Sequence, residues 1–547
     1  MDGKTEFDAA VQYLNGELDR LKHVDWKQRH QNLQNLQPED AWSFLNELLQ
    51  NAVDFNANNI RIKYENDKLI FEHDADVKRH PLDRDSIKGL CGIGESTKGL
   101  QSVGFMGIGF KFFIRFFSKV TICDGHVQFC MFFNPNDKDP TDHYKSLYRP
   151  TWVKSRNDIS QGYSTAFIFE EPFERTSGQL QEAFDDIDTK RFTTLAHEGL
   201  KSISIQERVF SCDVNQNKAV KITCEDEEWN YLILKREIEM SEEATDALRA
   251  KRLPPKESGN NRAKRSVRLI AEFQRNKDTT KLVLKPEKRG RLYCLVPLGD
   301  NLSFPFKIGL DADWFMPSDR KSVNNDPRAQ LWHHELVSRT LPSLLSEYLS
   351  TLDNSGEDRK KCTDIFPKLG PYKSDYQYSP AFQFLGDSDF LGILKVELEK
   401  CEFVLCADEN TRKPTEVRRI PVLPVAGSRR PEFDEPMSEK TASHIINKCF
   451  TKPIMEPSAI SQDAVTYLQK ELQLFKFPDP SEIVVDEIRS LWDKENPSEY
   501  HHVLDVLSEM VPKDEQGLEV VPLSNDKWGP LYGSKLVFEH VPKGKGV

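Results

Sequence analysis

Long apolar runs are missing from this chain of 547 residues. A membrane-spanning helix needs about 20 consecutive apolar residues, and no stretch of the sequence approaches that length. The first residues also lack the apolar segment of a signal peptide. These two absences predict a cytoplasmic protein without a membrane partner.

Cysteine is present, but its spacing is not that of a metal site. The ten cysteines lie scattered, none forms a Cys-x-x-Cys pair, and the nearest neighbours are Cys401 and Cys406. Structural zinc sites usually draw their ligands from closely spaced pairs. The cysteines therefore predict buried thiols in a reducing compartment.

An excess of positive charge is absent as well, because 87 Asp and Glu residues outnumber 75 Lys and Arg residues. The net charge of −12 argues against wholesale coating of nucleic acid, although a local basic surface stays open. Two basic clusters span 251–265 and 281–291, and neither contains aromatic residues for base stacking. We expect solvated loops there, and nucleic acid is not the favoured partner.

A helix with a polar stripe is expected around residues 47–54, which read ELLQNAVD. At about 100° per residue, Glu47, Asn51 and Asp54 fall within roughly 60° of one another. The plain interpretation is an amphipathic helix with a solvated polar face. Two carboxylates and a carboxamide in a row also suit a metal ion and a bound water. The opposite face carries the apolar residues Trp42, Leu45, Leu49 and Ala52.

A glycine-rich segment follows at residues 104–111, which read GFMGIGFK. Three glycines in six residues let backbone N–H groups approach an anion closely. The apolar run after them predicts a helix, whose N-terminus also favours negative charge. Its helically spaced residues, predicted to be core, are Phe110, Phe113, Ile114 and Phe117. The segment is not a Walker loop, because no Gly-Lys-Ser/Thr follows at the required spacing.

These segments carry a resemblance to a known superfamily. Residues 47–54, 71–74 (FEHD), 93–98 (IGESTK) and 104–111 resemble the ordered boxes of the GHKL ATPases, which include gyrase B, the ninety-kilodalton heat-shock chaperone, histidine kinases and MutL. The sacsin-like branch is the most similar. Four boxes in register over about 65 residues are more specific than any single one. The resemblance implies a layered α/β sandwich of the GHKL (Bergerat) type that binds ATP and Mg²⁺.

The resemblance also implies roles for individual residues. Glu47 would be the general base that polarises the attacking water, Asn51 would hold Mg²⁺, and Asp74 would accept a hydrogen bond from the adenine amino group. Thr165 matches the strand threonine that supports this aspartate. The remaining nucleotide-contacting positions, which include a lid at 96–98, are Asp54, Ser96, Thr97, Lys98, Gly104, Gly107, Ile108, Gly109, Phe110 and Lys111.

One departure from the family pattern follows Asp74. The sacsin-like branch continues with Gly, whereas this chain has Ala75 and then Asp76. Ala75 narrows the space beside the base, and the carboxylate of Asp76 repels phosphate. Nucleotide affinity and base preference are therefore open.

Three domains are expected: a GHKL-type ATP-binding domain at 1–172, a second α/β domain at 173–352, and a mixed region at 353–547. Expected strands in the first are 59–65, 68–73, 118–124, 127–133 and 163–169. The second should begin with a helix at 180–200. Its segment 304–323 resembles a family loop in which an arginine reaches the γ-phosphate of the neighbouring domain, and Arg320 is the matching position.

The region after residue 353 carries no recognisable chemistry. Residues 401–414 and 520–530 share a pattern of apolar strand, polar turn and proline, which predicts two hairpins beside helices at 462–474 and 482–494. We expect this region to be the surface for a protein partner or client, and a homodimer also stays open.

The sequence as a whole predicts an ATPase whose nucleotide drives lid closure and domain docking, in chaperone-like remodelling or in gating a partner within a defence system. The alternative is a nucleotide-gated scaffold with little or no hydrolysis, which the altered residues after Asp74 favour. A histidine kinase is disfavoured because neither His23 nor His30 is followed by an acidic residue. A topoisomerase is disfavoured because no strand-cleaving domain is recognisable.

Overall fold

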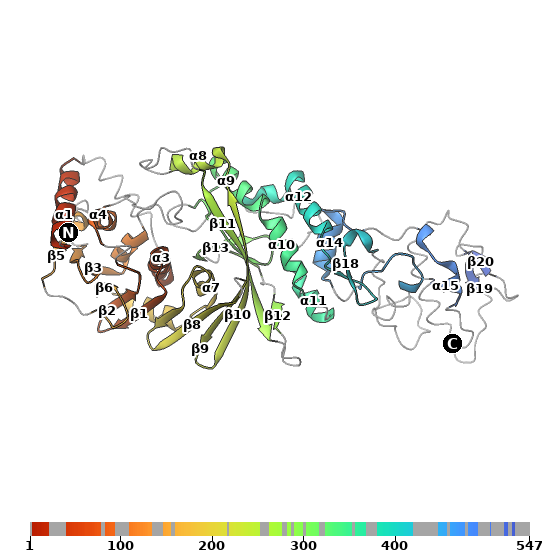
Figure 1. Cartoon of the computed structure of the whole chain (residues 1–547), viewed down its shortest axis with the longest axis horizontal. Coiled ribbons are helices and arrows are strands. Elements are labelled where there is room, and N and C mark those ends of the chain that lie inside the picture. Colours follow the sequence, from red (N-terminus) through yellow and green to blue (C-terminus); the bar gives the residue numbers. More distant parts are fainter. Residues whose placement is uncertain are drawn as a thin grey trace.

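The structure is a computed structural model of the whole chain. It describes residues 3–20, 40–77, 82–92, 109–133, 146–154, 159–215, 218–251, 262–275, 282–285, 289–298, 302–316, 323–352, 356–367, 380–418, 447–456, 460–475, 480–490, 504, 519–522 and 528–530. Figure 1 shows the N-terminal elements at one end of the molecule and the last hairpin at the other.

The described residues form a mixed α/β structure (Figure 1). Its helices, with η marking 3₁₀ turns, are α1 (Gly3–Arg20), α3 (Ala41–Asp54), α4 (Arg84–Cys91), η1 (Gly109–Arg115), η2 (Ser146–Tyr148), α6 (Thr176–Asp185), α7 (Lys190–His197), α8 (Glu242–Lys251), α9 (Pro327–Ser338), α10 (Leu341–Ser350), α11 (Gly356–Cys362), η4 (Pro380–Gly386), α12 (Ser388–Glu399), η5 (Pro414–Glu416), α14 (Gln462–Lys470), η7 (Pro480–Glu482) and α15 (Val485–Ser490).

Its strands are β1 (Asn59–Glu65), β2 (Lys68–His73), β3 (Phe117–Cys123), β4 (Gln128–Phe132), β5 (Thr151–Trp152), β6 (Thr165–Pro172), β7 (Ser202–Ile205), β8 (Arg208–Asn215), β9 (Ala219–Cys224), β10 (Glu227–Glu239), β11 (Lys264–Arg275), β12 (Leu282–Lys285), β13 (Gly290–Cys294), β14 (Val296–Pro297), β15 (Ser303–Phe304), β16 (Gly309–Asp311), β17 (Val404–Leu405), β18 (Thr411–Arg412), β19 (Glu519–Pro522) and β20 (Trp528–Pro530). The five strands expected up to residue 169 are confirmed to within a few residues.

One large mixed sheet joins most of these strands, in the order β14-β13-β16-β11-β10-β9-β8-β7-β1-β2-β6-β3-β4-β5. The β1–β2 hairpin turns through Asn66 and Asp67, which both have positive φ, at 51° and 59°. Short polar side chains tolerate that conformation, and the twist of such a turn matches that of the strands. β7 pairs with β1 in parallel, so the sheet continues past residue 172.

Strand β10 separates two buried cores. Successive side chains of a strand point to opposite faces of its sheet. Tyr231 and Ile233 belong to the first core, which α3 and α7 help to form, whereas Leu232 and Leu234 belong to the second, which α10 completes. Figure 1 shows β10 and β11 as long strands in the middle of the molecule. The two cores therefore lie on opposite faces of this strand.

The first core extends beyond the domain boundary that the sequence suggests at 172. It includes Leu195 on α7 and continues to Ile233, and the hydroxyl of Thr176 donates a hydrogen bond to the carbonyl of Phe116 at 2.8 Å. The expected helix at 180–200 is wrong as a single element, because Asp186–Thr189 separates α6 from α7. The three-part division of the chain stays a prediction.

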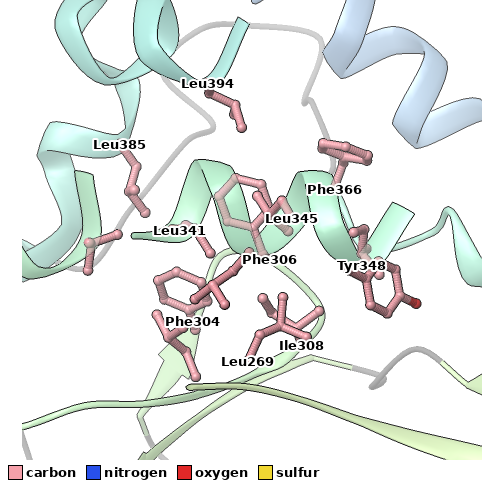
Figure 2. Packing of buried hydrophobic residues seen from close by; sticks show 14 of the residues in the cluster. Leu269, Phe304, Phe306, Ile308, Leu341, Leu345, Tyr348, Phe366, Leu385 and Leu394 are labelled. Carbon is pink, nitrogen blue, oxygen red and sulfur yellow. The ribbon is translucent and has the colours of Figure 1, made fainter. Parts of the chain in front are cut away.

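The second core is rich in aromatic residues. Figure 2 shows Phe304, Phe306 and Ile308 pointing toward Leu341 and Leu345 of α10. The rings of Phe304 and Phe306 lie 5.7 Å apart. At roughly 25 cal/mol per Å² of buried apolar area, such side chains hold the helix on the sheet.

The basic clusters are not simply solvated loops, which corrects the expectation for them. Arg265 lies in β11, is 5% exposed and pairs with Asp313 through Nε and Oδ2 at 2.5 Å. Arg291 lies in β13 and pairs with Asp188 at 2.9 Å. The buried guanidinium of Arg265 is therefore not available to a phosphate backbone. Residues 252–261 and 286–288 lie outside the described part.

The C-terminal region contains both expected hairpins. β17 pairs with β18 and β19 pairs with β20, each antiparallel. Of the helices expected there, α14 covers most of 462–474, while α15 is described only to Ser490. Within the described ranges, no helix has the length and apolar character needed to cross a membrane.

Candidate functional site

Helix α3 begins where its sequence supplies a cap. The carboxylate of Asp40 accepts a hydrogen bond from the backbone N–H of Ser43 at 2.7 Å, which satisfies one of the free donors of the first turn. The predicted apolar face is confirmed, because Trp42, Leu45 and Leu49 are all buried. This face fixes the helix on the first core and thereby orients its polar side.

The polar side of α3 is less solvated than an ordinary amphipathic helix requires. Glu47 is 6% exposed, while Asn51 and Asp54 are half-buried. A carboxylate seldom occupies a buried position without a specific partner or task. The plain interpretation of a solvated face is therefore wrong for Glu47.

The end of the glycine-rich segment packs against α3 as η1. The rings of Phe44 and Phe116 stack with their centroids 5.4 Å apart, and Phe110 and Phe113 are buried beside them. The expected helix is present only as a short 3₁₀ turn, because Phe117 already belongs to β3. The core assignment of this apolar run is confirmed.

The carboxylate of Asp74 accepts hydrogen bonds from the residues at and just before the start of β1. Its Oδ1 accepts hydrogen bonds from the backbone N–H groups of Asn58 at 2.7 Å and Asn59 at 2.8 Å, and its Oδ2 accepts one from the side chain of Asn59 at 2.6 Å. A carboxylate offers about four lone-pair positions. Asp74 thus ties β2 to the segment after α3 and retains about one position for a ligand.

His73 lies beside Asp74 and is held neutral. Burial lowers its pKa from 6.5 to about 4, and the nearby charge of Asp74 opposes this shift only in part. Its Nδ1 accepts a hydrogen bond from the N–H of Ala75 at 3.3 Å. Thr165 of β6 is the cross-strand partner of His73 and is also buried.

An aromatic chain connects the two halves of the candidate site. The ring of Phe167 lies 6.1 Å from that of His73 and 5.6 Å from that of Phe110, measured between centroids. Phe110 stands at the end of the glycine-rich segment, and His73 stands at the end of β2. The structure therefore brings together segments that are 37 residues apart in the sequence.

Acid should destabilise the protein through His73. Because the folded state lowers the pKa, the unfolded chain binds more protons between pH 6.5 and 4, so stability is full above pH 6.5 and falls as the pH decreases through this window. The loss between pH 7 and 4 is about 3 kcal/mol. Urea unfolding at both pH values should show that His73→Phe removes most of this acid-dependent part.

His126→Phe, which replaces an exposed histidine, controls for the change of histidine to phenylalanine itself. If wild type and His73→Phe lost the same free energy of unfolding between pH 7 and 4, His73 would not be the buried neutral group described above.

A row of residues with polar side-chain atoms on α3 was not predicted from the sequence. Trp42, Asn46 and Gln50 follow each other at intervals of four, and all three are at most 6% exposed. Trp42 was assigned only to the core, where its ring lies 4.7 Å from the guanidinium of Arg191. Helical spacing places Gln50 about 60° from Glu47 around the helix axis. This spacing is the feature of the sequence that indicates a place for Gln50 beside Glu47.

Several predicted site residues lie outside the described part of the chain. They are Ser96, Thr97, Lys98, Gly104, Gly107, Ile108 and Arg320, and the same holds for the side chain of Lys111. Gly109 is described as the first residue of η1. On either side of residues 317–322, the N–H of Asn324 donates to the carbonyl of Phe315 at 2.8 Å.

In the part of the chain that the structure covers, no group of three or more His, Cys, Asp and Glu side chains is arranged to hold a metal ion. Nucleotide-bound Mg²⁺ requires fewer protein ligands, because it keeps several waters and binds phosphate oxygens. Asn51, one turn after Glu47, is a suitable oxygen donor. Comparison with protein-family models and with curated proteins finds no match for this chain.

Proposed function

We propose that this chain binds ATP and Mg²⁺ between α3, η1 and the end of β2. It then hydrolyses the bond between the γ-phosphate and ADP, in the manner of GHKL ATPases. One observation carries the proposal. Glu47, a buried carboxylate, lies on the helix that packs against η1, into which the glycine-rich segment leads. A carboxylate in such a position suits the activation of water beside a phosphate.

In this proposal Glu47 is the general base. The oxygen of the attacking water forms a bond to the γ-phosphorus, while the bond from that phosphorus to its bridging oxygen breaks and its electron pair leaves with ADP. Glu47 accepts a proton from the water and later returns it to the phosphate product or to solvent. Backbone N–H groups of the glycine-rich segment neutralise charge on the phosphates.

Mg²⁺ supplies positive charge to the phosphate oxygens when it is bound. Asn51 would hold it through its side-chain carbonyl, because this residue is half-buried and lies on the same side of α3 as Glu47. An amide oxygen suits a hard cation, and a neutral ligand leaves the negative charge of the site to the nucleotide and to Glu47.

Asp74→Asn is expected to weaken ATP binding about ten-fold, because charge-assisted hydrogen bonds contribute roughly 1.5–3 kcal/mol. It should also lower stability, since an amide cannot accept from Asn58 and Asn59 at both of its ends. Calorimetric titration with ATP measures the first effect and urea unfolding the second.

Asp76→Asn is the matched control for Asp74→Asn. It removes the same charge two residues away, at an exposed position, and leaves the hydrogen bonds of Asp74 intact. It should not weaken ATP binding, because the carboxylate that it removes repels phosphate. Equal ATP affinity in Asp74→Asn and wild type would place the adenine contact at another residue.

The proposal extends to the rest of the chain. Arg320 would reach the γ-phosphate and dock the second half of the chain on the first, so that nucleotide state drives a movement that acts on a protein partner or client. The buried ion pair of Arg265 and Asp313 holds Asp313, which lies four residues before the segment that carries Arg320.

Steady-state phosphate release by the purified chain tests hydrolysis directly. The competing function is a nucleotide-gated scaffold, and the three hydrogen bonds that already occupy Asp74 favour it. An ATPase releases phosphate continuously in a magnesium-dependent manner. A scaffold binds ATP in calorimetry without releasing phosphate, and a protein that does neither would refute both functions.

A further inference from the structure

Among the described residues, four buried polar atoms in one row of side chains on α3 have no hydrogen-bond partner. They are Nε1 of Trp42, Oδ1 of Asn46, and both Nε2 and Oε1 of Gln50. The three residues form a single row with a spacing of four, one helical turn per step. Gln50, which is 1% exposed, contributes a donor and an acceptor to this row.

Such a row is costly for a folded protein. More than 90% of buried polar groups in native structures have a partner, and each one without costs about 1–3 kcal/mol. An apolar residue at position 50 would avoid this cost. The amide of Gln50 is therefore best explained by a partner that binds to it during function.

The place of Gln50 on the helix indicates that partner. Side chains of a helix lean toward its N-terminus, so a residue covers the turn that precedes it. The amide of Gln50 is thereby carried toward Glu47, its neighbour three positions earlier on the helix surface. A molecule that bridges the two groups must be small and must both donate and accept hydrogen bonds, as water does.

We propose that Gln50 is a further catalytic residue, which orients the attacking water together with Glu47; this inference rests on the proposed ATPase function. Oε1 of Gln50 accepts one hydrogen of the water, and the other hydrogen points to Glu47. A lone pair of the water oxygen is then directed at the γ-phosphorus. Glutamine orients the attacking water in other phosphoryl-transfer enzymes by the same chemistry.

The chemical step keeps its balance with Gln50 in place. The water oxygen bonds to phosphorus, the bond to the bridging oxygen breaks, and the transferred proton goes to Glu47. The second hydrogen stays on the oxygen that has joined the phosphate. Gln50 neither gains nor loses a proton, so its contribution is orientation alone.

Gln50→Met tests this role, because methionine has nearly the same length and shape without the amide. We expect kcat for phosphate release to fall on the order of 10²-fold, as misplacement of a reacting group does. Calorimetric affinity for ATP should stay within about two-fold of wild type, since the water contact adds little to ground-state binding. The thermal midpoint without nucleotide should be at least as high as that of wild type, because an unsatisfied amide has been removed.

Gln181→Met on α6 is the matched control. Gln181 is exposed and its side chain donates to Asp185 at 2.8 Å, so this variant should keep the wild-type kcat. Gln50→Asn is a second variant, which keeps the amide but shortens the side chain by one methylene. Its kcat should also fall, because the amide no longer reaches the water.

Two results would overturn the role of Gln50 while leaving the ATPase function intact. One is wild-type kcat in Gln50→Met or in Gln50→Asn. The other is a lower thermal midpoint in Gln50→Met together with a loss of ATP affinity as large as the loss of kcat. That result would make Gln50 a structural residue. A wild-type chain that releases no phosphate would instead refute the ATPase function, and this inference with it.

Discussion

Glu47→Ala is expected to keep ATP binding, while its rate of ATP hydrolysis falls on the order of 10²-fold or more. A general base acts on the water and contributes little to ground-state affinity for the nucleotide. Glu47 is 6% exposed, so alanine also leaves a small cavity. Glu47→Gln, which preserves the volume and removes the proton acceptor, should show the same loss of turnover without that cavity.

Steady-state phosphate release and calorimetric titration with ATP together check this prediction. Glu182→Gln on α6 is a suitable control, because it removes one carboxylate from an exposed helical position. Undiminished turnover in both Glu47 variants would remove this residue from the mechanism. Loss of ATP affinity in parallel with turnover would mean that Glu47 shapes the site and is not its base.

Arg320→Ala is expected to reduce turnover on the order of 10³-fold, the lower range for arginines that stabilise a transferring phosphoryl group. The γ-phosphate is present in ATP and absent in ADP, which supplies the differential affinity that a nucleotide-driven movement requires. Affinity for ADP should therefore stay nearly unchanged. Arg320→Lys should be a poor substitute, because a point charge lacks the planar, bidentate fork.

Phosphate release and small-angle scattering with and without a non-hydrolysable ATP analogue test the role of Arg320. Wild type should become more compact with the analogue, and Arg320→Ala should not. Lys321→Ala changes the neighbouring basic residue and should behave as wild type does. Equal effects of the two variants would indicate a general electrostatic contribution of this segment and would contradict a specific contact by Arg320.

Local sequence patterns predicted much of the fold. The alternation in 59–65 and 68–73 gave the two strands of the first hairpin, and the turn residues Asn66 and Asp67 explain where it reverses. The apolar spacing of Trp42, Leu45 and Leu49 gave the buried face of α3. These features depend on neighbouring residues alone, which is why a single sequence contains them.

Features that depend on distant contacts escaped prediction. Arg265 stands in a basic cluster, yet it is buried because Asp313, 48 residues away in the sequence, offers its carboxylate. Glu47 was given a solvated face as its plain interpretation, although packing of the first core buries it. The hydrogen bonds of Asp74 likewise come from the start of β1. Periodicity shows which side of a helix is apolar, but tertiary packing decides how deeply the other side is buried.

The extent of the first core also depends on contacts between distant residues. The first core reaches Ile233 through β7 and β8, and β7 joins the sheet by pairing with β1 in parallel. Parallel pairing needs a long crossover connection, here α6 and α7. Just after residue 172, the buried Thr176 is bonded to Phe116 of the first core.

The location of a bound nucleotide tests the central claim most directly. A crystal structure of the whole chain with Mg²⁺ and a non-hydrolysable ATP analogue should show the phosphates between Glu47 and the start of η1. It should also show the metal ion at Asn51 and the adenine at the end of β2 beside Thr165. A nucleotide bound at any other place, or an analogue that does not bind under saturating conditions, would contradict the assignment of α3, η1 and β2 as an ATP site.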